Sequence, residues 1–262
     1  MFKYIQIETT TFCNASCWFC PNDLVPKEHM DIDLIYKIIN DTRGMGITYR
    51  PFGLGEPLVD TRMPEICRYI KQDPTAVVEI HSNGEPMTPK MELNIAPYVD
   101  IVRFSVDGFT EKTFNEVRGI KFKNTYDNVA RFMRNNPSID IRVRMINLPG
   151  TELEQVDFKN YWNNIRPGCA DITELYDHPW ETQTESLSEP CKKVIDEAFV
   201  FIDGTMYLCP WDFGKRNPVG TVDHATSPVD IWNNAKYNEY RKLLGAGRRC
   251  DIELCSKCSA VF

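Results

Sequence analysis

Long apolar segments are missing from this chain of 262 residues. No stretch approaches 18 uncharged apolar residues, and a membrane-spanning helix needs about 20, so none is expected. The N-terminal residues 1–8 also lack the basic start and apolar core of a secretory signal peptide. We therefore expect a cytoplasmic protein with no membrane partner.

An excess of positive charge is also absent. Lysine and arginine number 30 against 37 aspartate and glutamate residues, which gives a formal net charge of −7. A nucleic-acid-binding surface is therefore not expected. The length permits one large α/β domain, or a medium domain with a small appendage.

Cysteine, by contrast, is plentiful, with ten residues. In a reducing compartment this number favours metal or redox use over disulfides. Cys13, Cys17 and Cys20 stand close together in the segment TFCNASCWFC. Three thiolates can hold three irons of a [4Fe–4S] cluster and leave the fourth iron open for a substrate or cofactor. A zinc knuckle is the alternative, but structural zinc requires four closed ligands.

The cysteine triplet, with the aromatic Phe19 directly before its last member, resembles the signature of the radical SAM enzymes. The resemblance implies that S-adenosylmethionine binds the open iron and is cleaved to methionine and a 5′-deoxyadenosyl radical. That radical removes a hydrogen atom from an unactivated carbon, while the protein binds, orients and shields the cofactor and the substrate. The resemblance also implies a flavodoxin- or ferredoxin-type electron donor.

Strand-like and helix-like patterns alternate through the first two thirds of the chain. The strand-like runs cover residues 4–8, 47–53, 76–81, 100–106, 139–146 and 171–176. A helix over 33–42 carries an apolar stripe of Leu34, Ile35, Ile38 and Ile39. Six alternations predict an α/β fold with a parallel sheet, whose functional loops gather at the carboxyl ends of the strands. Periodicity alone does not distinguish a doubly wound sheet from a barrel, whereas the resemblance implies a partial (β/α)6 TIM-like barrel.

Several loops after these strands match cofactor-binding loops of the family. The segment 53–57, GLGEP, follows the second strand, although Leu54 interrupts the glycine pair of the family motif. In isolation each loop could be an ordinary turn, and an arginine could be a solvated helix residue. The residues that the resemblance assigns to S-adenosylmethionine are Phe19, Gly55, Glu56, Pro57, Ser82, Asn83, Ser105, Asp107 and Arg118.

A second cysteine set lies near the C-terminal end: Cys191, Cys209, Cys255 and Cys258. Four thiolates make a complete site, and spacing alone leaves a zinc ribbon open. The surrounding sequence resembles the SPASM/Twitch extension of radical SAM enzymes, which implies an auxiliary [4Fe–4S] cluster. We therefore expect a radical SAM core over residues 1–180 and a SPASM/Twitch domain over 181–262.

Further elements are expected in this second region. Residues 181–190 are polar and turn-rich and predict a linker, followed by a hairpin over 198–209 and a helix over 228–244. Cys250 is interpreted as a free thiol, because four ligands already close the site. Cys67 and Cys169 are interpreted as buried small hydrophobic residues.

The whole chain most resembles the radical SAM dehydrogenases of 2-deoxy-scyllo-inosamine, which implies oxidation of a polar alcohol, cyclitol or sugar-like. Hydrogen abstraction removes one electron, and the auxiliary cluster would accept the second. Radical modification of a peptide or protein side chain stays open, although the chain begins almost at its first strand and leaves no room for a leader-binding domain. A non-catalytic iron–sulfur electron carrier is the third hypothesis.

The substrate-binding residues are the least determined. Asp177 and His178, after the sixth strand, could accept the substrate proton if they lie within hydrogen-bond reach. Arg144, or its neighbour Arg142, could project toward the barrel mouth from the fifth strand. Each of these residues could equally be a loop or surface residue.

Overall fold

The computed structural model describes residues 1–175 and 188–258. Six parallel strands form the first part of the sheet: β1 (Tyr4–Ile7), β2 (Thr48–Arg50), β3 (Val77–Ser82), β4 (Ile101–Ser105), β5 (Asp140–Asn147) and β6 (Ala170–Glu174). The helices that alternate with them are α1 (Ile32–Asp41), α2 (Met63–Ile70), α3 (Pro89–Ile95), α4 (Glu111–Arg118), α5 (Phe122–Asn135) and α6 (Gln155–Ile165). The expected α/β architecture of a partial barrel is confirmed.

The helix α1 shows why the sequence folds this way locally. Asp31 caps its N-terminus by accepting hydrogen bonds from the amides of Asp33 and Leu34. The predicted apolar stripe faces the sheet, since Ile35, Ile38 and Ile39 are buried in the core. The helix thereby covers the outer face of the sheet.

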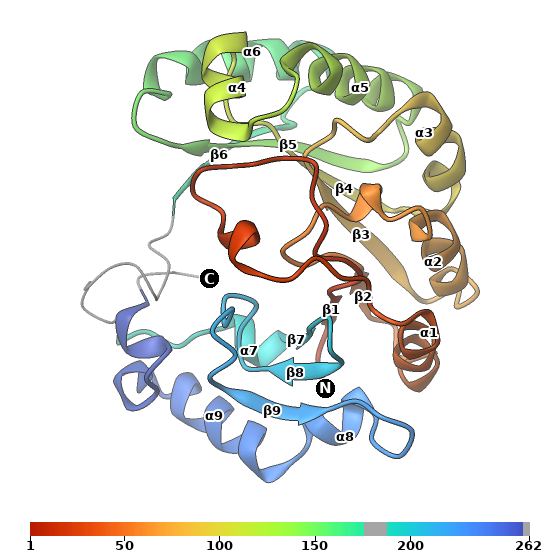
Figure 1. Ribbon diagram of the computed structural model, residues 1–262, viewed down its shortest axis with the longest axis vertical. Coiled ribbons are helices and arrows are strands. Elements are labelled where there is room, and N and C mark those ends of the chain that lie inside the picture. Colours follow the sequence, from red (N-terminus) through yellow and green to blue (C-terminus); the bar gives the residue numbers. More distant parts are fainter. Residues whose placement is uncertain (176–187, 259–262) are drawn as a thin grey trace.

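The strands have two different faces. On β1, Ile5 and Ile7 are fully buried in the core that the helices cover, whereas Gln6 between them is partly exposed. On β5, Val143 is likewise buried and Arg144 is partly exposed. Successive side chains of a strand point to opposite faces. The outer face is therefore apolar and the inner face polar, and the segment between β1 and α1 lies on that inner side (Figure 1).

The C-terminal part continues the same sheet. Strand β7 (Glu197–Val200) pairs in parallel with β1, and β8 (Thr205–Tyr207) and β9 (Pro218–Thr221) follow antiparallel, so the strand order is β6-β5-β4-β3-β2-β1-β7-β8-β9. The predicted hairpin is confirmed as β7 and β8. Its parallel pairing with β1 was not predicted. The expected domain boundary at 180/181 lies outside the described residues, and the division into two domains stays a prediction.

One predicted element was wrong in its extent. The single helix expected over 228–244 is two helices, α8 (Pro228–Trp232) and α9 (Ala235–Gly245). The break occurs because Asn234 leaves the helical conformation and caps α9, accepting a hydrogen bond from the Tyr237 amide at 2.8 Å. A short helix α7 (Lys193–Asp196) precedes β7 (Figure 1).

Short 3-10 helices complete the chain. They are η1 (Pro21–Leu24), η2 (Pro57–Val59), η3 (Ala96–Tyr98), η4 (Glu152–Glu154), η5 (Arg249–Asp251) and η6 (Cys255–Lys257). Within residues 1–175 and 188–258, no helix has the length and apolar character needed to cross a membrane. That finding agrees with the absence of long apolar runs in the sequence.

Candidate active site

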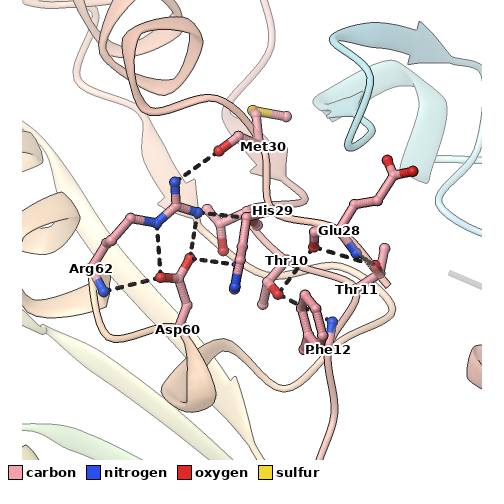
Figure 2. A network of polar contacts seen from close by, with 9 residues as sticks. Thr10, Thr11, Phe12, Glu28, His29, Met30, Asp60 and Arg62 are labelled. Carbon is pink, nitrogen blue, oxygen red and sulfur yellow. Dashed lines mark hydrogen bonds and ion pairs between the residues drawn. The ribbon is translucent and has the colours of Figure 1, made fainter. Parts of the chain in front are cut away.

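The two ends of the loop that carries the first cysteines are joined to each other. The Thr11 amide donates to the Glu28 carbonyl at 3.0 Å, and the Met30 amide donates to the Thr9 carbonyl at 3.0 Å. The Thr11 hydroxyl accepts a hydrogen bond from the Glu28 amide at 2.8 Å. Figure 2 shows the contact between Thr11 and Glu28. The loop is thus closed at its base, and its cysteines lie in the part beyond that base.

An ion pair fastens this base to the loop after β2. The Arg62 guanidinium donates to both carboxylate oxygens of Asp60, at 2.9 and 2.8 Å. It also donates to the carbonyls of Met30 at 2.9 Å and of Thr9 at 3.3 Å, one on each arm of the loop (Figure 2). Asp60 is almost fully buried, so its carboxylate in this bidentate pair is shielded from water, whereas Arg62 is partly exposed. We call the Asp60–Arg62 pair the clamp.

The three cysteine side chains converge on one small cavity, which Asn22 also lines. Burial is the main cause that raises the pKa of Cys13 to about 11, and Glu56 and the nearby thiols of Cys17 and Cys20 contribute to the same shift. Burial also raises the pKa values of Cys17 and Cys20. Bound iron stabilises the thiolate that burial disfavours. Three partly buried, mutually close thiols are a donor set that fits an iron–sulfur cluster with one open iron.

Gly55 allows the Gly-Glu-Pro turn to lie directly on the cysteine loop. A Cβ atom at this position would lie 2.4 Å from the Thr10 carbonyl oxygen and 2.6 Å from that of Phe12. Backbone atoms cannot move aside as a flexible side chain can, so only glycine fits here. The next amide, that of Glu56, donates to the Phe12 carbonyl at 2.9 Å.

The Glu56 carboxylate is buried at the centre of the loops that follow β2 and β3. It accepts hydrogen bonds from the amides of Leu58 at 3.0 Å and Asn83 at 2.7 Å. Burial raises the pKa of Glu56 to about 7, although the Asn83 and Leu58 amides oppose the shift. The Asn83 amide group in turn donates to the Asn14 side chain at 2.9 Å. This network connects the Gly-Glu-Pro turn, the loop after β3 and the cysteine loop.

Arg118, the last residue of α4, reaches the cysteine loop from the opposite side. Its guanidinium forms an ion pair with Asp107 and lies 3.6 Å from the Cys17 sulfur. Burial alone would lower the pKa of Arg118, but Asp107 and Cys17 outweigh it and raise the pKa. The Arg118 carbonyl also accepts a hydrogen bond from the Ser16 amide at 3.0 Å. Its buried Nε has no hydrogen-bond partner within the described residues and is available to a ligand.

These loops enclose one cavity of about 220 Å³. Besides Cys13, Cys17 and Cys20, the residues of the predicted cofactor set that line it are Phe19, Gly55, Glu56, Ser82, Asn83, Ser105 and Arg118. The other two members lie behind this wall, because Pro57 is buried at the start of η2 and Asp107 is fully buried against Arg118. The arrangement fits a bound S-adenosylmethionine beside the open iron. Each residue's role toward the cofactor stays a prediction.

A second, larger cavity of about 420 Å³ adjoins the first, and Phe19, Cys20, His81 and Arg118 line both. Its wall contains several aromatic residues, and polar residues from the first three strands, Gln6, Arg50 and His81, also line it. Most of the residues that line this cavity were not predicted from the sequence as site residues: Gln6, Glu8, Arg50, Phe52, His81, Lys193, Phe199, Trp211 and Phe213. Polar residues alternating with buried ones on parallel strands, as in 79–81, were the available signal.

Arg50, Glu79 and His81 form a connected group on the inner face. The Glu79 carboxylate accepts hydrogen bonds from Arg50 Nε and His81 Nε2, both at 2.8 Å. Burial would raise the pKa of Glu79, but His81 and Arg50 outweigh it and lower the pKa to about 2. The His81 ring stacks on Phe52 with 4.2 Å between ring centroids. Glu79 is therefore ionised, and His81 is held on two sides.

Of the three predicted substrate residues, the structure describes only Arg144. Arg144 lies on the partly exposed face of β5, with its Nε 3.9 Å from Asp171. It is two residues before Ile146, which lines the larger cavity. Asp177 and His178 lie outside the described residues. The substrate role of all three stays a prediction.

The second cysteine set is also brought together. Burial is the main cause that raises the pKa of Cys255 to about 12, and Cys191 and Cys258 contribute to the same shift. Burial raises the pKa of Cys209 strongly, and Cys255 and Cys191 contribute in the same direction. Cys255 therefore lies within electrostatic range of the other three thiols, as a shared cluster site requires. Cys250, in contrast, is exposed.

No three His, Cys, Asp or Glu side chains within residues 1–175 and 188–258 are arranged to hold a single metal ion. A [4Fe–4S] cluster binds each thiolate through a different iron, so its ligands need not meet at one point. The cysteines outside the two sets behave as expected for hydrophobic residues, since Cys67 and Cys169 are buried in the core.

These features define a radical SAM enzyme, and comparison with known proteins agrees. The radical SAM superfamily model matches residues 7–159, so the chain belongs to that superfamily. An iron–sulfur cluster-binding domain, SPASM, matches residues 191–259. The predicted cofactors, S-adenosylmethionine with a [4Fe–4S] cluster and auxiliary iron–sulfur binding, are confirmed at the level of the family.

Particular relatives cover almost the whole chain. The S-adenosyl-L-methionine-dependent 2-deoxy-scyllo-inosamine dehydrogenase of Niallia circulans is 24% identical over 100% of this chain and 94% of its own. The structure of BtrN in complex with AdoMet and 2-DOIA has a TM-score of 0.71, 20% identity and coverages of 100% and 94%. The structure of anSMEcpe with AdoMet and Kp18Cys peptide has a TM-score of 0.73, 12% identity and coverages of 97% and 88%. The predicted oxidoreductase class and the fold are supported by these findings.

Proposed function

We propose that this enzyme oxidises a hydroxyl group of a small polar substrate to a ketone by radical chemistry. The substrate would be a cyclitol or a sugar-like molecule. One observation carries the proposal: the larger cavity is bounded on one side by Phe19 and Cys20 of the first cysteine loop. On another side it is bounded by Pro210 and Trp211, directly after Cys209 of the second set. A substrate there would lie between the site that generates a radical and a site that can accept an electron.

The electron count requires both sites. Oxidation of an alcohol to a ketone removes two electrons and two protons, and loss of one hydrogen atom accounts for only half of them. When bound, the cofactors supply a 5′-deoxyadenosyl radical for the hydrogen atom and a fully ligated cluster for the second electron. The chain itself holds the first cluster through Cys13, Cys17 and Cys20 and keeps water from the reacting carbon.

The second cysteine set would hold the auxiliary cluster. Cys191, Cys209, Cys255 and Cys258 supply four thiolates, which close the site against substrate and leave it suited to electron exchange. The proposed division of the chain follows: residues 1–180 generate the radical, and residues 181–262 carry the acceptor. A flavodoxin- or ferredoxin-type donor would supply the electron that starts each turnover.

The shape and chemistry of the larger cavity favour a small substrate. About 420 Å³ is within the usual range for small-molecule sites. Aromatic faces such as Phe52 and Trp211 can pack on the carbon faces of a ring, and polar groups such as Gln6 can bind its hydroxyls. The name of the Niallia circulans relative supports the same substrate class.

Peptide modification is the second candidate, favoured by the similarity to a structure with a bound peptide. The two candidates predict different deuterium donors. The test uses the enzyme with both clusters reconstituted anaerobically, S-adenosylmethionine and a low-potential reductant. We expect deuterium from ring-deuterated 2-deoxy-scyllo-inosamine or a related cyclitol to enter 5′-deoxyadenosine, with a ketone formed in equal amount.

Two results would contradict the proposal. Transfer of deuterium from a peptide but from no cyclitol or sugar would establish the second candidate. Absence of 5′-deoxyadenosine under every condition would instead support an electron carrier. The matched control is the Cys250→Ser variant, which changes an exposed thiol outside both sets and should behave as the unmodified enzyme.

A further inference from the structure

His81 lies where the two cavities adjoin. It lies near the end of β3 and lines both the cavity of about 220 Å³ and that of about 420 Å³. Its side chain is 32% exposed, so the ring is accessible even though the strand around it is buried. A substrate in the larger cavity would meet a cofactor in the smaller one at this junction.

The contacts of His81 define its protonation pattern. Glu79 is ionised and can only accept hydrogen bonds, so His81 Nε2, 2.8 Å from Glu79 Oε1, carries the ring proton. In the neutral ring the other nitrogen, Nδ1, then holds a lone pair. Burial lowers the pKa of His81, against the opposing effect of Glu79, which keeps the ring neutral near pH 7.

The surroundings maintain this state. On β3 itself Glu79 faces the ring, and on the neighbouring elements the charged groups are Arg50 of β2, Arg103 of β4 and Arg144 of β5. The Arg50 and Arg144 charges lower the pKa of His81. Phe52 stacks on the ring at 18° and fixes its plane. The imidazole is thus oriented by a carboxylate and restrained by an aromatic ring, as a general base is.

We propose that His81, oriented by Glu79, is the catalytic base that accepts the hydroxyl proton of the substrate. This inference rests on the proposed dehydrogenase function and names a proton acceptor for it. The balance is complete: the carbon-bound hydrogen atom goes to the 5′-deoxyadenosyl radical and the hydroxyl proton to His81 Nδ1. The remaining electron goes to the auxiliary cluster, and the carbon–oxygen bond becomes a carbonyl.

The first test is the His81→Ala variant of the reconstituted enzyme with ring-deuterated 2-deoxy-scyllo-inosamine. We expect ketone formation to fall about 10²- to 10⁴-fold, the usual contribution of a general base. Deuterium should still enter 5′-deoxyadenosine, because hydrogen abstraction does not need the base. Added imidazole should restore part of the ketone, since the truncated side chain leaves room for it.

The His224→Ala variant is the matched control. It removes an exposed histidine that lines neither cavity, so it should leave ketone formation unchanged. Iron content and thermal unfolding of both variants separate loss of the base from loss of the fold. The ketone-forming rate of the unmodified enzyme should fall as pH falls through the pKa of His81, and the imidazole-rescued variant should follow the pKa of free imidazole instead.

Three outcomes would overturn the assignment. Ketone formation by His81→Ala within about 3-fold of the unmodified enzyme would remove His81 from proton transfer. Equal loss of deuterium transfer and ketone, with no rescue by imidazole, would make His81 a substrate-binding residue. If the unmodified enzyme forms no ketone from any alcohol, the proposed function itself fails and the assignment falls with it.

Discussion

The two cysteine sets both supply partly buried thiols, but the chain holds them by different means. Cys13, Cys17 and Cys20 come from one loop, whose ends are joined by hydrogen bonds and fastened by the clamp. The second set is spread over residues 191–258, on segments beside α7, β8 and η6. A site with an open iron must direct that iron at a cavity, and the contacts at the base of the loop restrain its position. A closed site can be completed by its metal bonds.

The largest effect is expected from removing the first cysteine set. Replacing Cys13, Cys17 and Cys20 together by alanine should abolish 5′-deoxyadenosine formation, because the open iron would be lost. The second set should still bind about four irons per chain. Chromatography of the reaction and an iron assay measure both quantities. Residual cleavage of S-adenosylmethionine by the triple variant would refute the assignment of the first site.

The converse change tests the second set. Cys255→Ala should lower the iron content from about eight to about four per chain, because one closed site would lose a ligand. Cleavage of S-adenosylmethionine should persist, whereas ketone formation should fall below detection for want of an electron acceptor. An unchanged ketone yield would show that the second electron leaves by another route. Cys250→Ala, at an exposed thiol, is the control.

A smaller effect is expected from the clamp. Arg62→Gln leaves the buried Asp60 carboxylate without its bidentate partner and releases two loop carbonyls. We expect the free energy of unfolding to fall by about 2–4 kcal/mol, with faster loss of iron from the first site than from the second. The control is Arg68→Gln on the exposed side of α2. Equal iron loss from both sites would argue against a role specific to the first loop.

The smallest effect is expected from replacing a cysteine that is buried but is not expected to bind a cluster. Cys67 is fully buried in α2, as the sequence analysis predicted. Cys67→Ala should cost about 1 kcal/mol of stability through lost packing and leave the iron content unchanged. Thermal unfolding and iron analysis measure the two effects. A loss of iron in this variant would mean that a buried cysteine outside the two sets also takes part in cluster binding.

Much of the site could be predicted because its residues follow one another in short motifs. Gly55 and Glu56 were identified from the GLGEP segment, and the structure adds the reason: a side chain at Gly55 would collide with two carbonyls of the cysteine loop. Arg118 was identified from its motif, but its ion pair with Asp107 was not. Partners far apart in the chain leave no local pattern.

Other features depended on contacts that no short motif records. The break between α8 and α9 at Asn234 is a local capping signal that the longer apolar pattern concealed. The pairing of β7 with β1 joins residues 197–200 to residues 4–7 and continues the barrel sheet into the C-terminal part. His81 was not predicted as a site residue, because a functional role for a polar strand residue can be inferred only when the inner face of the sheet is known.

By itself the sequence determined the chemistry available to this protein, because the spacing of thiols, glycines and turn residues depends on local geometry. It determined the six alternating strands for the same reason, since periodicity is local. Only the tertiary structure decided where that chemistry converges: on two adjoining cavities, with His81 between them and Cys20 and Trp211 on the wall of the larger one. Convergence depends on which strands pair, and pairing joins residues that are distant along the chain.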